Sequence, residues 1–414
     1  MRILDLSQAY AGPFCTMNLA DHGAEVIKIE RPGVGDQVRT WGPMKNGESG
    51  FHACLNRNKS GITLDLKSEE GKEVFRRLLK TADVVCENYK VGVLEKLGFS
   101  YEAMKAINPR IIYANITGFG LNGELAHRPC YDIVAQAMGG MMDVTGFADG
   151  LPTKVGPAIA DNYTGALLAI GILMALYKRE QTGEGGHVDV AMVDTMIHIM
   201  DHFVIDYTIL GELHSRSGNS DQAIAPFDSF QAKDGMFVLA CGTNEMFAKL
   251  CDMMGRPELP QDSRFVTNFE RCNHYAALKP QIEAWSTTKT VQELEEMILA
   301  AGIPFGRIQN IEQLVNHPQT RARNMLWEVD QPGMGKITIT GTPIKISYEE
   351  DSIMKCWEKI LQKSWPPSAI LLRSSLRSLE RASSKSGKAH YIARQKGLLS
   401  EPPNRVRTGV LFIF

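Results

Sequence analysis

One acidic side chain, Asp161, stands at the start of a long apolar run, within VGPAIADNYTGALLAIGILMALYKRE (residues 155–180). The helical pattern alone predicts an N-cap of a helix that begins at Asn162, because Asp is among the residues that most often take that position. A second role is chemical. The partial positive charge of a helix N-terminus would hold the carboxylate ionised in a partly apolar site, and a fixed, desolvated carboxylate can attack an activated acyl group. The two roles do not exclude each other.

Two other patterns resemble a metal site and a dinucleotide-binding loop, but each lacks part of the motif. In HIMDH (198–202), His198 and His202 share one face of the expected helix, but a third ligand and a general base are missing. GFGLNG (118–123) fits the glycine pattern of a dinucleotide-binding loop. It is followed by ELAHRPCYD rather than by a helix, which favours an ordinary glycine-rich loop after a strand. We therefore expect no metal site, and an NAD-dependent oxidoreductase is only a remote alternative.

The elements that must position these residues alternate along the first half of the chain. Short β-branched runs predict buried parallel strands, and helical patterns lie between several of them. This alternation predicts an open, doubly wound α/β sheet of the Rossmann type, in which ligands bind beyond the carboxyl ends of the strands. The predicted strands are RILDLS (2–7), EVIKIE (25–30), ITLDL (62–66), DVVCENY (83–89) and RIIYANIT (110–117), and the predicted helices are GPFCTMNLADHG (12–23) and SEEGKEVFRRLLKTA (68–82).

The pattern changes beyond this unit. A helical stretch covers about 193–212, a hairpin turned at Asp234-Gly235 spans 225–242, helices follow to about 303, and 325–347 returns to strands. We predict a large α/β domain over 1–200, with 321–350 returning to it, and a smaller α+β domain over 215–320. Residues 351–414 form an atypical basic tail, rich in lysine, arginine and serine, with the composition of a disordered segment.

Composition excludes several classes of protein. The chain has 414 residues, 44% hydrophobic and 22% charged, as in globular proteins. Lys plus Arg (45) nearly balances Asp plus Glu (47), which gives no reason to expect a nucleic-acid or membrane partner. The eight cysteines occur singly, which favours reduced thiols and a cytoplasmic location. No signal-peptide pattern opens the sequence. The apolar run 165–177 is shorter than a membrane span of roughly 20 residues, so we expect a buried helix there.

Four long motifs follow one another along the chain: LDLSQAYAGPFCTMNLADHGAEVIKIERPGVGD, NRNKSGITLDLKSEEGKEVFRRLLKTADVVCENYKVGVLEKLGFSYEAMKAINPRIIYANITGFG, RPCYDIVAQAMGGMMDVTG and GEGGHVDVAMVD. In this order they resemble the motifs of the class III CoA-transferases, the family of formyl-CoA transferase and carnitine CoA-transferase. The similarity covers about 2–347 and fades after GTPIKIS, and the Leu-Gly-Glu-His pattern that usually closes family members is absent. The resemblance implies an interlocked homodimer, two rings linked like a chain.

In that family the catalytic Asp begins the long helix after a P-T-x-x-G stretch, and PTKVGPAIADNYTG puts Asp161 there. The resemblance implies that Asp161 attacks the thioester of a donor acyl-CoA, giving a mixed aspartyl anhydride and free CoA thiolate. The thiolate then forms an aspartyl-CoA thioester, and an acceptor carboxylic acid takes the CoA. Coenzyme A thioester is thus a substrate, no cofactor or metal is bound, and the GFG loop and backbone N–H groups near Asp161 are candidates for stabilising oxyanions.

The resemblance also implies the residues that bind CoA, a polyanion that needs cations and backbone donors. Without the resemblance, Arg31, Lys67 and Lys96 would be interpreted as solvated surface charges. Lys96 takes a place often held by Arg, which exchanges a bidentate phosphate contact for a point charge. By motif match the set is Tyr10, Ala11, Arg31, Leu64, Lys67, Asn88, Tyr89, Lys90, Lys96, Tyr131 and Asp132.

Two further alternatives stay open. The same superfamily contains α-methylacyl-CoA racemases, whose catalytic His falls where this chain has Tyr131. A Tyr with an ordinary pKa of about 10 is a poor proton shuttle at neutral pH, which counts against racemisation, although His127 lies close in sequence. A CoA-binding role without catalysis is the other alternative, should the altered tail disable the protein. The small-domain loop NSDQAIAPFD (219–228) is expected to help select the acids exchanged.

Overall fold

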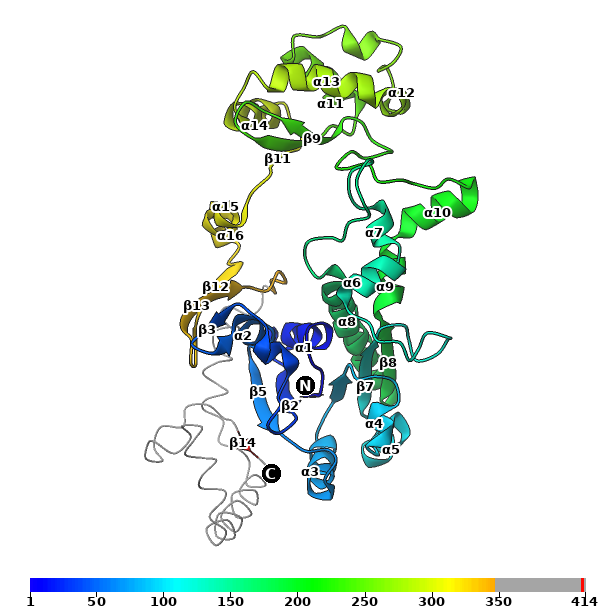
Figure 1. Cartoon of the computed structure of the whole chain (residues 1–414), viewed down its shortest axis with the longest axis vertical. Coiled ribbons are helices and arrows are strands. Elements are labelled where there is room, and N and C mark those ends of the chain that lie inside the picture. The colour runs from blue at the N-terminus through cyan, green and yellow to red at the C-terminus, as the bar shows by residue number, and fades with distance from the viewer. Residues whose placement is uncertain (347–410, 413–414) are drawn as a thin grey trace.

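A parallel sheet forms the centre of the larger lobe of the molecule (Figure 1). The computed structural model describes residues 1–346 and 411–412. The sheet has the order β14-β5-β2-β1-β6-β7-β8. The chain passes from β1 through β2 to β5 and then returns to β6 beside β1, so the direction of winding reverses between β1 and β6. The strands are β1 (Arg2–Asp5), β2 (Glu25–Glu30), β5 (Lys59–Thr63), β6 (Val84–Glu87), β7 (Ile112–Thr117), β8 (Gly186–Ala191) and the two-residue β14 (Leu411–Phe412).

Helices cover both faces of this sheet, because successive residues of one strand enter different cores. Ile3 and Val84 lie in a core with helices α1, α6, α8 and α9, whereas Leu4 and Val85 lie in a core with α3, α4 and α5. The predicted doubly wound α/β sheet is therefore confirmed. The helices are α1 (Ala11–Asp21), α2 (Gly50–Leu55), α3 (Glu69–Leu79), α4 (Val93–Lys96), α5 (Tyr101–Ile107), α6 (Asp132–Met138), α7 (Met141–Val144), α8 (Ile159–Thr182), α9 (Met192–Ile199) and α10 (Asp201–Leu210), with the 3₁₀ turn η1 (Gln37–Thr40).

Individual strands differ from their predictions in two places. The strand predicted at 62–66 begins three residues too late, since β5 starts at Lys59. β8 was not predicted. It is an edge strand whose polar residues His187 and Asp189 are exposed, so it lacks the continuous apolar run that marked the buried strands. EVIKIE, by contrast, has the predicted bounds of β2.

A second core lies in the smaller lobe, at the top of Figure 1. An antiparallel sheet of order β11-β10-β9 contains the predicted hairpin, and its residues Phe230 and Phe237 are fully buried against the surrounding helices. The elements are β9 (Phe227–Gln231), β10 (Met236–Ala240), α11 (Asn244–Met253), η2 (Leu259–Gln261), α12 (Asn268–Asn273), α13 (Tyr275–Ser286), α14 (Val291–Ala300) and β11 (Phe305–Arg307).

The chain then returns to the larger lobe through α15 (Ile311–Asn316) and α16 (Pro318–Ala322). The predicted strands 325–347 form their own antiparallel pair, β12 (Leu326–Gln331) and β13 (Gly335–Thr340), rather than joining the central sheet. This pair lies beside the short hairpin of β3 (Met44–Lys45) and β4 (Glu48–Ser49), where Lys45 Nζ donates to the Lys336 carbonyl at 3.2 Å. The domain boundaries stay a prediction, and the tail 351–414 lies outside the described residues apart from β14.

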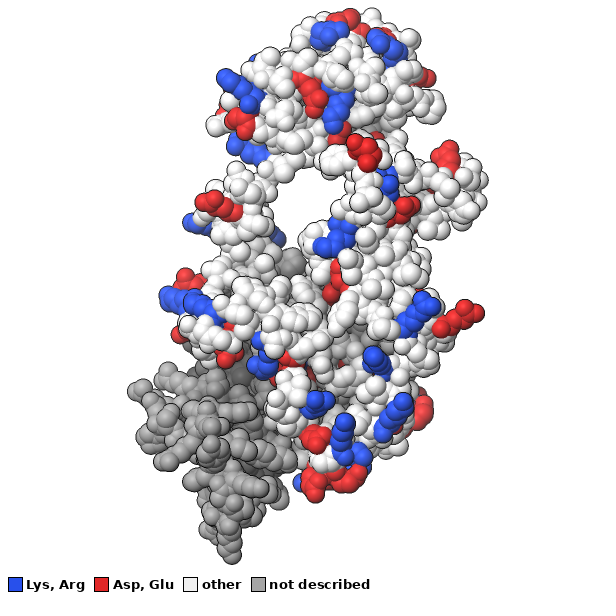
Figure 2. Space-filling view, viewed as in Figure 1, with Lys and Arg blue, Asp and Glu red and all other residues white. Residues whose placement is uncertain are grey.

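Within residues 1–346, two segments connect the lobes, and Figure 2 shows an opening between the lobes. Lysines, arginines, aspartates and glutamates are interspersed over both lobes in that view, without a face of one sign. The described segments on the two sides are the residues after α10 and the residues between β11 and α15.

Helix α8 differs from its prediction as a buried helix. One face, including Leu168 and Ile172, is fully buried, but the opposite face is exposed, with Met174 at 66% and Tyr177 at 71%. By length and composition α8 is the one helix in the described chain that could cross a membrane, a test that core helices of soluble proteins also pass. The prediction was wrong because apolar residues occur on every side of this helix, so the sequence periodicity cannot tell which side packs against the rest of the protein.

The N-terminal part of α8 packs directly on the backbone of α1. A Cβ atom at Gly165 would lie 2.5 Å from the Ala11 carbonyl oxygen and 3.2 Å from the Cys15 nitrogen. Asp161 is four residues earlier, so it occupies the same face of α8 as Gly165. Gly165 therefore sets how closely Asp161 approaches the start of α1.

We expect Gly165→Ala to destabilise the protein by about 1–2 kcal/mol. Alanine favours the helix by about 1 kcal/mol, but overpacking typically costs about 1–3 kcal/mol, and here the nearest atoms belong to backbone that cannot rotate away. Urea unfolding measures the change. Gly171→Ala is the matched control in the same helix, because its new methyl would meet only a methyl group of Val188, and it should lose less stability. Equal unfolding midpoints for the two variants would contradict the packing argument.

Candidate active site

A pocket of about 310 Å³ opens beyond the carboxyl ends of β1, β6 and β7. The segments that follow these three strands supply most of its wall, and the first turn of α8 supplies Asp161. The pocket thus lies where the winding of the sheet reverses, which is the usual ligand position in doubly wound sheets. It is lined by Gln8, Ala9, Tyr10, Ala11, Gln37, Asn88, Tyr89, Lys90, Val91, Ile116, Thr117, Gly118, Ala126, His127, Arg128, Pro129, Cys130, Tyr131, Asp161 and Met192.

The loop after β1 is fixed on two sides. Gln8 and Asn88 exchange two hydrogen bonds, from the Gln8 backbone N–H to Asn88 Oδ1 at 2.7 Å and from Asn88 Nδ2 to the Gln8 carbonyl at 2.8 Å. The Ala9 N–H donates to Asp36 Oδ1 at 2.9 Å, which supports the left-handed backbone of Ala9 at φ 62°. Asp36 is itself paired with the buried Lys28 at 3.0 Å. Tyr10 and Ala11 therefore enter the pocket from a rigid loop.

Tyr10 stands beside Asp161 as a neutral hydroxyl group. Burial, followed by the neighbouring Cys54 and Asp161, raises the pKa of Tyr10 above its usual value. Its ring packs against Phe14 and Phe51, with centroid separations of 6.4 and 6.3 Å. A phenol that keeps its proton at neutral pH can donate a hydrogen bond in the pocket.

Asp161 does not cap the helix, contrary to the prediction. Helix α8 begins at Ile159, three residues before the expected start, and its N-cap, Ala158, offers no side-chain oxygen. The capping acceptor comes from another helix. Asp132 Oδ1 accepts hydrogen bonds from the backbone N–H of Ala160 at 2.8 Å and of Asp161 at 3.4 Å. The side chain of Asp161 is therefore left to face the pocket.

Burial, and then the negative charge of Asp132, raises the pKa of Asp161 to about 7. The expectation that the helix N-terminus would hold Asp161 ionised is therefore wrong. Burial penalises the charged form, and the N–H groups of the first turn are bonded to another carboxylate. Near neutral pH, Asp161 is partly protonated, and its ionised form is more basic than an ordinary aspartate.

The backbone donors of this turn are fully used. Besides the two bonds to Asp132, the Ile159 N–H donates to the Pro157 carbonyl at 2.9 Å, and the Asn162 N–H to the Ala158 carbonyl at 3.0 Å. They are not free to stabilise an oxyanion, as the sequence had suggested. Gly118 of the GFG loop lines the pocket, whereas the Gly120 N–H is bonded to Thr117 Oγ1 at 2.8 Å. Gly118 therefore remains the candidate from that loop.

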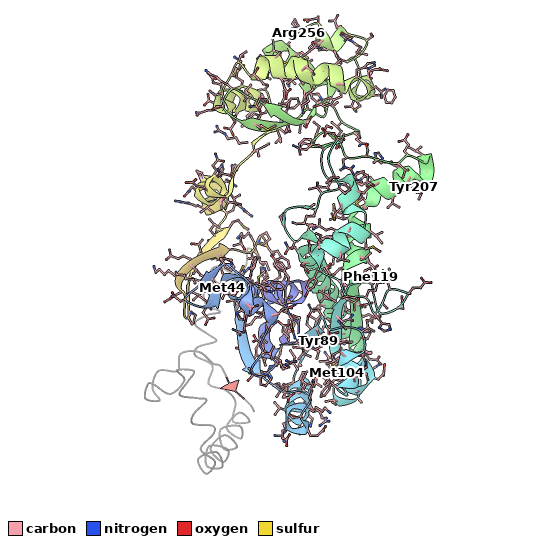
Figure 3. All side chains as sticks on the ribbon, viewed as in Figure 1. Met44, Tyr89, Met104, Phe119, Tyr207 and Arg256 are labelled. Carbon is pink, nitrogen blue, oxygen red and sulfur yellow. The ribbon has the colours of Figure 1, made fainter. Side chains whose placement is uncertain are left out.

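Some of the predicted site residues line the pocket, and others lie outside it. Arg31, Lys67 and Lys96 are exposed and lie outside its lining. Leu64 is 3% exposed within a core, and its N–H donates to the Glu30 carbonyl at 2.9 Å, so only its backbone carbonyl is open to a ligand. The carboxylate of Asp132 is bonded to α8 and lies outside the lining. Figure 3 shows Tyr89 close to the central sheet, whereas Tyr207 lies on α10, away from it. The predicted residues that line the pocket are Tyr10, Ala11, Asn88, Tyr89, Lys90, Tyr131 and Asp161.

The sequence missed Gln8, Gln37 and Arg128, which also line the pocket. Arg128 could have been identified from the sequence, since it is the first residue of the quoted motif RPCYD. Gln37 was not, because it belongs to a short 3₁₀ turn without a chemical pattern. The loop 219–228 lies elsewhere. Its residues Asn219, Phe227 and Asp228 border a separate cavity of about 220 Å³ in the smaller lobe.

The histidine pair 198–202 does not share a helix face, contrary to the prediction. Helix α9 ends at Ile199 and α10 begins at Asp201, so Met200 interrupts the helix between the two histidines. His198 stacks on Tyr163 at 6.2 Å, and His202 contacts Asp201 at 3.0 Å. Within residues 1–346, no group of three or more His, Cys, Asp or Glu side chains is placed to hold a metal ion.

Comparison with known proteins connects this pocket to a family. The profile described as CoA-transferase family III matches residues 1–355. The chain is 42% identical to acetyl-CoA:oxalate CoA-transferase of Acetobacter aceti, over 84% of this chain and 89% of that one. It is also 42% identical to succinyl-CoA:mesaconate CoA-transferase of Haloarcula hispanica, with the same coverage, and 37% identical to succinyl-CoA:glutarate CoA-transferase of Homo sapiens, over 84% and 80%.

Solved structures support the same family assignment. A CAIB/BAIF family protein from Brucella suis has a TM-score of 0.74 at 40% identity, over 84% of this chain and 92% of that chain. A protein from Mycobacterium tuberculosis has a TM-score of 0.75 at 32% identity, with the same coverage. At these identities both the fold and the family are shared.

The raised pKa of Asp161 predicts a pH-dependent stability. Between the unfolded value of 3.8 and the folded value of about 7, the folded state binds more protons, so stability falls as pH rises through this window. We expect Asp161→Asn to stabilise the protein at pH 8 by on the order of 2 kcal/mol, discounted because the side chain is partly exposed, and to have little effect at pH 4. Urea unfolding at the two pH values measures the difference. A loss of stability at pH 8 would contradict the raised pKa.

Proposed function

The chain belongs to CoA-transferase family III and is a CoA-transferase, and on that premise we propose that Asp161 is its nucleophile. One observation carries this proposal. Among the described residues that line the pocket, Asp161 is the only acid, and it lies on a rigid helix beside a neutral phenol. A desolvated and basic carboxylate is suited to attack a thioester.

The proposed reaction proceeds by acyl exchange on this carboxylate. Asp161 attacks the thioester carbonyl of the donor, the C–S bond breaks, and CoA leaves as thiolate with a mixed aspartyl anhydride behind it. The thiolate attacks the aspartyl carbonyl, which releases the donor acid and leaves an aspartyl-CoA thioester. The acceptor carboxylate displaces the thiolate to give a second anhydride, and the thiolate then takes the acceptor's acyl group, which frees Asp161. Tyr10 and the loop at Gly118 support the oxyanions.

We further propose that the acceptor is a small dicarboxylic acid. The relatives named above act on oxalate, mesaconate and glutarate, all of which carry two carboxylates. Lys90, His127 and Arg128 line the same pocket as Asp161. One carboxylate of the acceptor can react at Asp161 while a cation binds the other. The donor is an acyl-CoA such as acetyl-CoA or succinyl-CoA.

CoA itself is proposed to lie across the pocket and its outer rim. Tyr10, Ala11, Asn88, Tyr89, Lys90 and Tyr131 would contact the pantetheine end, because they line the pocket with Asp161. The exposed Arg31, Lys67 and Lys96 would bind phosphates, and the backbone carbonyl of Leu64 would accept a hydrogen bond from CoA at the edge of the core. A cytoplasmic location is supported by the seven described cysteines, each a free thiol.

We also propose a homodimer built on α8 and α10. A large exposed apolar surface usually marks an interaction site. The exposed face of α8 carries Leu173, Met174 and Tyr177, and α10 carries Ile209 and Leu210 at 73% and 63% exposure. The opening between the lobes in Figure 2 is compatible with the interlocked arrangement that the family resemblance implies.

Acyl transfer should depend on Asp161. We expect Asp161→Ala to lower CoA transfer by at least roughly 1000-fold, because the step it removes is covalent. A donor acyl-CoA followed by hydroxylamine should modify the peptide that contains residue 161, as measured by mass spectrometry. Asp143→Ala, which removes an exposed carboxylate of α7, is the matched control and should transfer normally.

His127 lies in the same pocket as Asp161, which keeps racemisation as the second candidate. Solvent deuterium entering the α-position of a 2-methylacyl-CoA without any acceptor acid would favour it. Unchanged transfer in Asp161→Ala, or modification only at other residues, would defeat the proposed nucleophile.

The dimer proposal is tested by mass in solution. We expect sedimentation analysis to give about twice the 45.9 kDa of one chain. Met174→Glu with Tyr177→Glu should weaken association at least tenfold, since two charges would be buried in an apolar interface. Val266→Glu, at an exposed apolar position of the smaller lobe, is the control. A wild-type monomer at micromolar concentration would contradict the proposal.

A further inference from the structure

We propose that Asp132 is a positioning residue for the acyl-transfer reaction, which keeps the helix donors away from the carboxylate of Asp161. The inference rests on the proposed role of Asp161 as nucleophile. It assigns Asp132 a different task from the CoA contact that motif matching implied, and it follows from the bonds at the start of α8.

Both oxygens of Asp132 are occupied. Oδ1 accepts from the Ala160 and Asp161 N–H groups, at 2.8 and 3.4 Å, and Oδ2 accepts from Gln136 Nε2 at 2.6 Å. Gln136 is fully buried, and its Oε1 accepts from the Val155 N–H at 2.9 Å. The carboxylate of Asp132 is thus held between α6, the segment before α8 and the first turn of α8 itself. Because both of its oxygens accept hydrogen bonds, the carboxylate of Asp132 has little freedom to rotate.

This arrangement reverses the usual effect of a helix N-terminus. Free N–H groups in a first turn normally stabilise a nearby anion. In α8 those groups are bonded either to Asp132 or to backbone carbonyls. Among the described residues, no protein donor is bonded to the carboxylate oxygens of Asp161. The anion that receives the stabilisation is Asp132, and the neighbouring Asp161 meets its negative charge instead.

The other groups around Asp161 leave Asp132 as the main charged neighbour. Tyr10, from the loop before α1, has a raised pKa and remains neutral. Burial, and then Asp161, raises the pKa of Cys130, just before α6, to about 11, so it too is neutral. The cations Lys90 and Arg128, with His127, line the wider wall of the pocket. Burial and the Asp132 charge together keep Asp161 basic and reactive.

Infrared spectroscopy of the full-length protein tests this directly. The C=O band of protonated Asp161 is identified as the pH-dependent band that Asp161→Asn removes, and its half-titration pH is measured. We expect Asp132→Asn, which keeps an oxygen for the Ala160 N–H, to lower this pH by roughly one unit. Asp132→Ala should lower it also, because it frees the donors. Asp143→Asn is the matched control and should leave it unchanged, and thermal unfolding verifies that each variant is folded.

A kinetic readout separates this inference from the proposed function. The rate at which a donor acyl-CoA labels residue 161 should have an acid limb that moves to lower pH by the same amount in Asp132→Asn, with a slower rate on the alkaline plateau. A band that titrates at the wild-type pH in both Asp132 variants would overturn the inference. Absence of acyl label on residue 161 of the wild-type protein would instead reject the nucleophile, whatever the infrared titration gives.

Discussion

The direct contact between the backbones of α1 and α8 sets how closely Asp161 approaches the start of α1. Gly165 allows the two helices to approach so closely that a side chain at this position, even a methyl group, would collide with the backbone of α1. Because α1 follows the loop after β1, this contact brings Tyr10 and Asp161, about 150 positions apart in sequence, to one pocket. The position of Asp161 in the pocket therefore depends on Gly165, which has no side chain. The opposite wall of the pocket is supplied by the sheet, at the point where its winding reverses.

A second set of interactions supports the loop after β1, which enters that pocket. The side chains of four residues are buried and paired, with Lys59 Nζ at 3.1 Å from Asp5 and Lys28 Nζ at 3.0 Å from Asp36. Burial lowers the pKa of Lys59 to about 8, a measure of what its desolvation costs. Such pairs contribute little net stability. Their effect is orientation, since Asp36 supports the left-handed Ala9 and thereby the entry of Tyr10.

Local patterns predicted the fold well, and the pocket only in part. Strands such as EVIKIE and the motif around Asp161 could be found because apolar periodicity and motif spacing are local properties. The cap of α8 could not, because its acceptor, Asp132, is on another helix, and only tertiary structure brings the two together. The exposed face of α8 was missed for a related reason. Composition gives the polarity of a helix, whereas its burial depends on what packs against it, here one side only.

On the proposed mechanism, the charge of Asp132 would connect protonation of Asp161 with its acylation. Both events remove the negative charge of Asp161, so both relieve the same repulsion from Asp132 and the same cost of burying an anion. A site that raises the pKa of this carboxylate therefore also favours the acylated state over the free carboxylate, by a comparable free energy. The anhydride and the aspartyl thioester are otherwise high in energy relative to an aspartate in water. The raised pKa of Asp161 and an accessible covalent intermediate would then share the same two physical origins, the burial of the carboxylate and the like charge of Asp132 held behind the first turn of α8.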